Sequence, residues 1–144
     1  MTELREKALK LVEEMPEKNL SMLIEFLNCR TQEATEEREK IFTAFVDELK
    51  KLYGADLKKV ILYGSYARGD FRDYSDIDIM ILLDNETDNK KKADELYKIT
   101  YDFDMEHNIF ISALTRDYLH YKGWRKVDPL YQNIDNDGVI LYAG

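Results

Sequence analysis

The residues of this chain best suited to chemistry are two carboxylates with one residue between them, Asp76 and Asp78. They open an apolar run, residues 77–83, that is typical of a buried strand. Alternate side chains of a strand share one face, so both carboxylates would point the same way. Neighbouring carboxylates repel each other, and a bound divalent cation relieves that repulsion. Carboxylate oxygens, completed by water and substrate phosphates, suit Mg²⁺.

A glycine and a serine, Gly64 and Ser65, end the preceding apolar run at residues 60–63. Glycine lets the backbone turn sharply and approach a ligand closely. If a helix begins there, its first N–H groups favour a phosphate, and the Ser65 hydroxyl adds a donor. Arg68, one turn later, could hold a phosphate oxygen. A phosphate-binding turn joined to a metal-binding carboxylate pair predicts phosphoryl or nucleotidyl transfer.

The elements that would position this site follow from the apolar pattern. From residue 59 onward, short apolar runs alternate with helical stretches. The expected strands are 60–63, 77–83, 109–114 and 139–142, and the expected helices are 90–106 and most of 115–136. Because helices come first and mixed strands and helices follow, the sequence predicts an α+β fold.

The first third of the chain is helical by pattern. Residues 3–15 carry apolar side chains on one face of an amphipathic helix, and Pro16 suits the first turn of a second helix. A third helix is expected from 41 to 52, with Gly54 as its stop. The Glu-rich stretch 31–38 is either a linker or an exposed first turn.

We therefore predict two parts, a helical hairpin at residues 1–30 and a second domain at residues 38–144. Two amphipathic helices this short cannot bury both their faces alone. The hairpin would pack against its own second domain, or it would bind a second copy or a partner protein. The sequence leaves these two interpretations equal.

Composition argues against several functions. A net charge of -8 disfavours a nucleic-acid partner, because an acidic surface repels phosphates. Cys29 is the only cysteine, so an internal disulfide and a cysteine metal cage are excluded. The N-terminus has no apolar signal core, and no stretch approaches the ~18 apolar residues of a membrane span. We expect a protein of the reducing cytoplasm that has no membrane partner.

Gly64-Ser65, ten intervening residues and Asp76-Ile77-Asp78 resemble the signature of the DNA polymerase β-like nucleotidyltransferases. The fuller run from Gly64 to Asp70 is similar to the bacterial minimal nucleotidyltransferases, abbreviated MNT. The resemblance covers about residues 40–144, and it implies a small mixed sheet flanked by helices. It also implies that ATP or another nucleoside triphosphate binds with its phosphates near Gly64 and Ser65. Asp76 and Asp78 would then ligate two Mg²⁺ ions.

In active relatives, a third acid on the next strand helps to activate the acceptor hydroxyl. The best-aligned residue here is Asn108, whose amide carries no charge and cannot take up a proton. Glu106, two residues earlier and in the same strand phase, is a candidate substitute, and Asp104 lies nearby. Turnover is therefore a separate question from nucleotide binding.

The run Leu11 to Leu27 resembles a helical segment of small bacterial antitoxins. Together with the MNT resemblance, it implies an antitoxin that transfers AMP onto a hydroxyl of a partner toxin of the HEPN class. The N-terminal helices could also form a homodimer. Two alternatives remain. One is a catalytically degenerate nucleotide-binding antitoxin or interaction module, and the other is a small-molecule nucleotidyltransferase of the aminoglycoside-modifying type.

Overall fold

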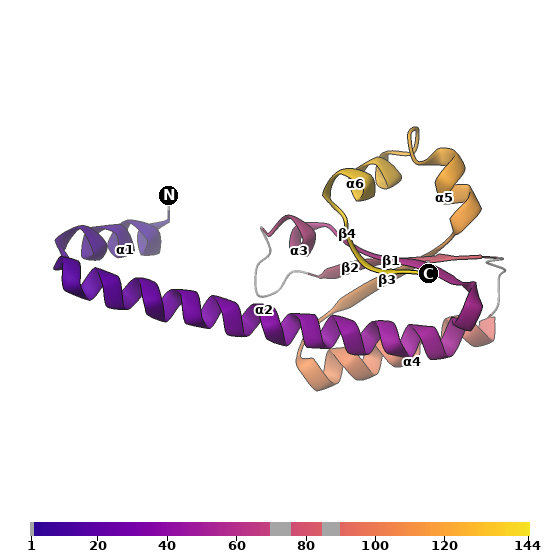
Figure 1. The fold of residues 1–144 in the computed structure, drawn as a ribbon, viewed down its shortest axis with the longest axis horizontal. Coiled ribbons are helices and arrows are strands. Elements are labelled where there is room, and N and C mark those ends of the chain that lie inside the picture. Colours follow the sequence, from indigo (N-terminus) through magenta and orange to yellow (C-terminus); the bar gives the residue numbers. More distant parts are fainter. Residues whose placement is uncertain (1, 70–75, 85–89) are drawn as a thin grey trace. The chain divides into compact units, whose positions relative to one another are not determined.

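The computed structural model describes residues 2–69, 76–84 and 90–144 (Figure 1). The elements follow the chain in this order: α1 (Glu3–Glu14), α2 (Glu17–Tyr53), the short 3-10 helix η1 (Gly54–Asp56), β1 (Leu57–Tyr63), α3 (Ser65–Arg68), β2 (Ile77–Leu83), α4 (Lys90–His107), β3 (Ile111–Asp117), α5 (Tyr118–Trp124), α6 (Pro129–Asp137) and β4 (Val139–Ala143). The α+β class predicted from the sequence is confirmed. None of the helices formed by these residues is long and apolar enough to cross a bilayer.

The chain forms two compact units, Met1–Ile41 and Phe42–Gly144, and the division falls inside α2. In the first unit, Thr2 caps α1 by accepting a hydrogen bond from the Arg5 N–H at 3.4 Å. The carbonyl of Pro16 then accepts hydrogen bonds from the first turn of α2. The second helix begins directly after Pro16, which precedes its first turn instead of lying in it.

The predicted second and third helices are one helix. The stretch 31–38, expected to be a linker or an exposed first turn, is helical throughout. It holds no glycine or proline, and glutamate, glutamine, alanine and arginine are all good helix formers. Acidic residues there also precede basic ones at helical spacing, as Glu36 precedes Lys40. The helix stops where predicted, because Gly54 follows Tyr53 in a left-handed conformation.

The second unit is built on a four-stranded mixed sheet with the order β3-β2-β1-β4. β1 runs antiparallel to both β2 and β4, whereas β2 and β3 are parallel and are connected through α4. β2 lies in the middle of the sheet, and its residues 79–82 are fully buried. An apolar strand of this kind is expected where both faces of a sheet are covered.

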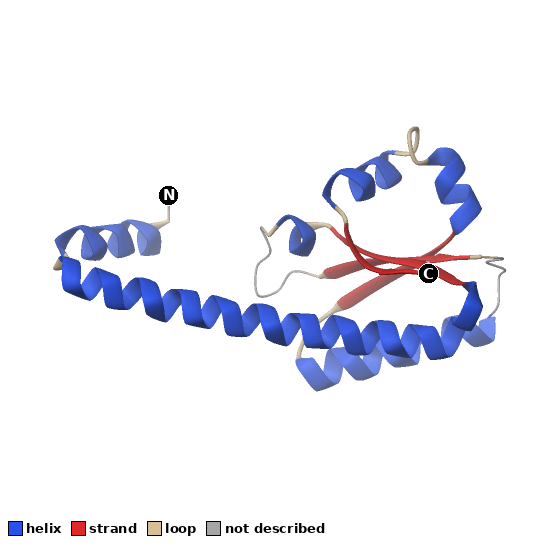
Figure 2. Cartoon of the chain, in the orientation of Figure 1, coloured by secondary structure: helices blue, strands red, loops and turns tan. Residues whose placement is uncertain are grey.

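Helices cover both faces of this sheet (Figure 2). On one face lie α4 and the Phe42–Tyr53 part of α2, where the Phe45 and Phe103 rings meet edge to face at 5.4 Å. On the other face α5 and α6 pack, and the core there joins strand side chains to helical ones: Ile61, Met80, Leu82, Tyr121, Tyr131 and Ile134. Asp78 has the same strand phase as Met80 and Leu82, so its side chain belongs to the α5–α6 face.

The third strand begins later than predicted. The helix α4 continues to His107, and Asn108 then takes a left-handed conformation with φ of 52°. The Asp104 carboxylate accepts a hydrogen bond from the Ile111 N–H at 2.8 Å, which fixes the entry into β3. The strand therefore covers residues 111–117 instead of 109–114.

Candidate active site

The turn after β1 is built on two glycines with positive φ. Gly64, at φ 74°, precedes the single helical turn α3, and Gly69, at φ 81°, ends it. The backbone N–H of Arg68 donates to the Gly64 carbonyl at 3.1 Å, and that of Gly69 donates to the Ser65 carbonyl at 2.9 Å. A helix of four residues adds little dipole, so anion binding here would depend on the backbone N–H groups at its start.

Gly64 lies directly against Asp78. A β-carbon built on Gly64 would overlap the Oδ2 atom of Asp78 and would approach its Cγ at 3.3 Å. Only a residue without a side chain allows the carboxylate to occupy this space. The turn and the carboxylate are therefore in direct contact.

The two carboxylates stand at the edge of β2. Asp76 is exposed just before the strand, and Asp78 is half-buried within it. Burial raises the pKa of the Asp78 carboxyl above its ordinary value, and the negative charge of Asp76 raises it further. The positive charge of Arg68 opposes this shift of the pKa. The structure thus brings together the Gly64 turn, Arg68 and both acids, as the sequence predicted.

The donor set at this edge suits a magnesium ion bound together with phosphates. Asp76 and Asp78 supply hard oxygen ligands, and Gly64 makes room for the Asp78 carboxylate. Among the residues that the structure describes, no group of three or more acidic, histidine or cysteine side chains forms a complete metal cage. Water and the oxygens of a bound nucleotide would therefore complete the coordination, as is usual for Mg²⁺.

The residues proposed for a third acid do not lie on the strand next to this pair. Asn108 occupies the left-handed turn before β3. The strand-phase argument for Glu106 is wrong, because Glu106 belongs to the last turn of α4, where its carboxylate lies 3.9 Å from the His107 ring. Asp104 is engaged in its hydrogen bond to Ile111.

Two neighbours of Asp78 were missed by the sequence analysis. In the register of the sheet, Asp78 pairs with Tyr63 on β1 and with Ser112 on β3. Burial, and then the charge of Asp78, raise the pKa of the Tyr63 hydroxyl, while Arg116 lowers it. Tyr63 could have been noticed as the last residue before Gly64. Ser112 could not, because its position depends on where β3 begins.

Comparison with known proteins shows the family to which this chain belongs. The sequence model of the nucleotidyltransferase domain matches residues 43–128. A candidate protein adenylyltransferase of Methanocaldococcus jannaschii, MJ0604, is 52% identical over 105 residues, which are 72% of this chain and 97% of that protein. A second candidate protein adenylyltransferase from the same organism, MJ1305, is 35% identical over 108 residues, which are 71% of this chain and 69% of that protein.

Solved structures with a similar arrangement share little sequence with this chain. A candidate nucleotidyltransferase from Sulfolobus solfataricus has 22% identity and a TM-score of 0.49, and the match covers 77% of this chain and 85% of that one. A toxin–antitoxin structure with AMP-PNP has 17% identity and a TM-score of 0.48, covering 70% and 73%. The family match and the relatives from Methanocaldococcus jannaschii are similarities of sequence. They show that this chain belongs to the nucleotidyltransferase domain family and is a nucleotidyltransferase.

Proposed function

We propose that this nucleotidyltransferase transfers AMP from ATP to a hydroxyl of a partner protein, and that it needs Mg²⁺ to do so. The observation that carries the proposal is the contact of the Gly64 turn with Asp78, which joins a phosphate-binding turn to a metal-binding carboxylate. The relative MJ0604, whose length this chain nearly spans, is a candidate protein adenylyltransferase. This supports a protein acceptor over a small molecule.

Each site residue has one role in this proposal. The first-turn N–H groups and the hydroxyl of Ser65 hold the triphosphate, and Arg68 contributes positive charge beside Asp78. Asp76 and Asp78 hold two Mg²⁺ ions, which when bound would neutralise the phosphate charge and polarise the α-phosphate. Gly64 has no side chain, so the Asp78 carboxylate can lie directly against the turn.

The transfer forms one bond and breaks one. The acceptor oxygen attacks the α-phosphorus, and the bond from that phosphorus to the oxygen bridging the α- and β-phosphates breaks. Pyrophosphate leaves with the bonding electron pair, and the hydroxyl proton passes to a nearby base or to water. The role of the protein is to hold the reacting atoms in line, which supplies much of the acceleration in such reactions.

We further propose that the acceptor is a toxin of the HEPN class, so that this protein is its antitoxin. The similarity of the run Gly64 to Asp70 to the minimal nucleotidyltransferases supports this partner. The N-terminal helices support it as well, since α1 buries none of its residues and its apolar side chains, such as Leu4 and Leu11, are exposed. We expect the reaction in the reducing cytoplasm, because Cys29 is the only cysteine.

The test is a transfer assay with ATP labelled at the α-phosphate. The purified protein, Mg²⁺ and a co-encoded HEPN-type protein should give labelled partner, whereas ATP labelled at the γ-phosphate should give none. The Asp76→Asn/Asp78→Asn variant and a sample with a chelator should also give none. If the label reaches a small hydroxyl compound but never the partner, the protein-acceptor proposal is wrong.

One observation favours a second candidate, a nucleotide-binding module without turnover. The residue paired with Asp78 on β3 is Ser112, and a hydroxyl is a poor proton acceptor. Such a module would bind ATP and the partner, and it would mask the partner without modifying it. Binding of both without label transfer at any ratio of the two proteins would favour this candidate.

A further inference from the structure

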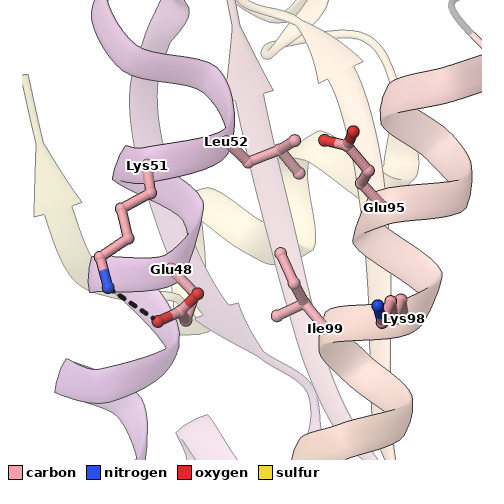
Figure 3. Close-up of a pocket in the computed structure, with 6 residues that line it drawn as sticks. All are labelled: Glu48, Lys51, Leu52, Glu95, Lys98 and Ile99. Carbon is pink, nitrogen blue, oxygen red and sulfur yellow. Dashed lines mark hydrogen bonds and ion pairs between the residues drawn. The ribbon is translucent and has the colours of Figure 1, made fainter.

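The face of the second unit opposite the active site carries a groove between α2 and α4 (Figure 3). Its volume is about 280 Å³. Leu52 and Ile99 form an apolar floor, and the rim is charged on both sides by Glu48 and Lys51 of α2 and by Glu95 and Lys98 of α4. A groove with an apolar floor and a charged rim is a typical contact surface for another protein.

The charges on the rim alternate around the groove. Because α2 and α4 run in opposite directions here, residue 51 of α2 is level with residue 95 of α4, and residue 48 is level with residue 98 (Figure 3). Lys51 and Glu48 already form an exposed ion pair at 3.1 Å. Each lysine follows a glutamate three residues earlier on its own helix, and the order of the charges along α2 is reversed in space along α4.

Such an alternating square of charges is complementary to itself. Consider a two-fold axis that lies in the plane of this face and runs perpendicular to both helices. Rotation about it places each helix against its own copy, and the two copies run antiparallel. Under this rotation Lys98 meets Glu95 of the second copy, and Lys51 meets Glu48 of the second copy. All four rim charges then face opposite charges, as an interface between identical subunits requires.

The outer face of α4 adds an apolar stripe beside this rim. Tyr97, Tyr101 and Met105 follow one another at helical spacing, and their exposed fractions are 72%, 53% and 68%. Large apolar side chains aligned in this way on a helix surface usually mark an interface. When α4 meets its own copy antiparallel in the register that pairs Lys98 with Glu95, this stripe lies beside the rim contacts, and the second copy would cover part of it.

We propose that the α2–α4 face binds a second copy of this chain and forms a two-fold dimer through antiparallel α4 helices. The active-site acids point to the other face of the sheet, where α5 and α6 lie. Dimerisation through α4 would therefore leave both sites open to nucleotide and to an acceptor. The proposal does not depend on the acceptor or on the reaction.

The test is the mass of the full-length protein by sedimentation velocity and light scattering, over an about hundredfold range of concentration. The parent protein should shift from monomer to dimer within this range of concentration. Lys98→Glu should raise the dissociation constant of the dimer at least about tenfold, because in both subunits the new carboxylate would face Glu95 of the other subunit. Tyr101→Ser should also weaken it. Lys126→Glu makes the same charge change at an exposed position away from the groove, and it should have no effect.

Two double variants distinguish how the helices pair. Lys98→Glu/Glu95→Lys should restore the dimer, because it exchanges the charges within α4. Lys98→Glu/Glu48→Lys would restore it only if α4 faced α2 of the second copy, and that result would overturn the α4 pairing. A parent that stays monomeric, or a Lys98→Glu variant that dimerises like the parent, would also overturn the proposal. A MgATP titration of each variant, expected to be unchanged, checks that the site remains intact.

Discussion

Gly64 and Asp78 are in contact although they lie on different elements, the turn after β1 and the strand β2. The α-carbon of Gly64 lies so close to the Asp78 carboxylate that a methyl group there would overlap Oδ2. The positive φ of Gly64 independently disfavours any other residue. The position is therefore restricted twice, by the backbone and by the neighbouring carboxylate.

Gly64→Ala should weaken MgATP binding beyond any effect of backbone strain. The matched control is Gly54→Ala, which also has a positive φ, but whose added β-carbon would meet nothing within 4 Å. Both variants should lose roughly 1–2 kcal/mol of unfolding free energy from the left-handed backbone. Calorimetric titration with MgATP should show reduced affinity for Gly64→Ala alone. Equal MgATP affinities for the two variants would show that the nucleotide does not bind at the Gly64 turn.

Asp76→Asn/Asp78→Asn should abolish the Mg²⁺-dependent part of ATP binding, because amides bind Mg²⁺ far more weakly than carboxylates do. The control is Asp84→Asn, which follows the far end of the same strand and lies 3.9 Å from Lys58. Titrations with and without a chelator measure the Mg²⁺-dependent part. Retention of that part in the double variant would refute the metal-site assignment.

Asp78→Asn should stabilise the protein at neutral pH when no metal is present. Because the pKa of Asp78 is raised in the folded state, the folded protein retains its proton at pH values where the unfolded chain has lost it. The unfolding free energy therefore falls as pH rises above the ordinary value of 3.8, and the ionised carboxylate destabilises the fold at pH 7.

Thermal melts in a chelator check this sign. The Tm of Asp78→Asn should exceed that of the parent at pH 7, and the difference should shrink toward pH 3, where both chains carry a neutral group. Mg²⁺ with ATP should raise the Tm of the parent and leave that of the variant unchanged. A variant less stable than the parent at pH 7 would show that the carboxylate makes a net stabilising contact.

Ser112→Asp should increase nucleotidyl transfer more than Asn108→Asp does. The sheet register pairs Ser112 with Asp78, so a carboxylate there would join the metal-binding pair, whereas residue 108 lies in the turn after α4. We expect a gain of up to about 10²-fold in the transfer rate, the low end of what acid–base assistance contributes. The measurement is initial rate at saturating MgATP. A larger gain from Asn108→Asp would mean that the third acid position lies in the turn after α4 and not on β3.

The sequence by itself determined those features that depend on local periodicity. The run of apolar residues predicted β2 with its observed bounds, Ile77–Leu83, and the alternation of a strand put Asp76 and Asp78 on one face. The glycines predicted the turn after β1 and the end of α2, because positive φ strongly favours glycine. These inferences need only the nearest residues along the chain.

The tertiary structure decided which distant residues meet. Whether residues 108–110 extend a helix, form a turn or begin a strand depends on the Asp104 hydrogen bond to Ile111, which joins the end of α4 to β3. That contact moves β3, and with it Ser112, to the side of Asp78 and leaves Glu106 on a helix. The overlap that a side chain at position 64 would make with Asp78 likewise exists only once β1 and β2 have paired. Neighbours across a sheet are set by strand register, and a register shift of one residue turns every side chain to the other face, so periodicity alone cannot supply them.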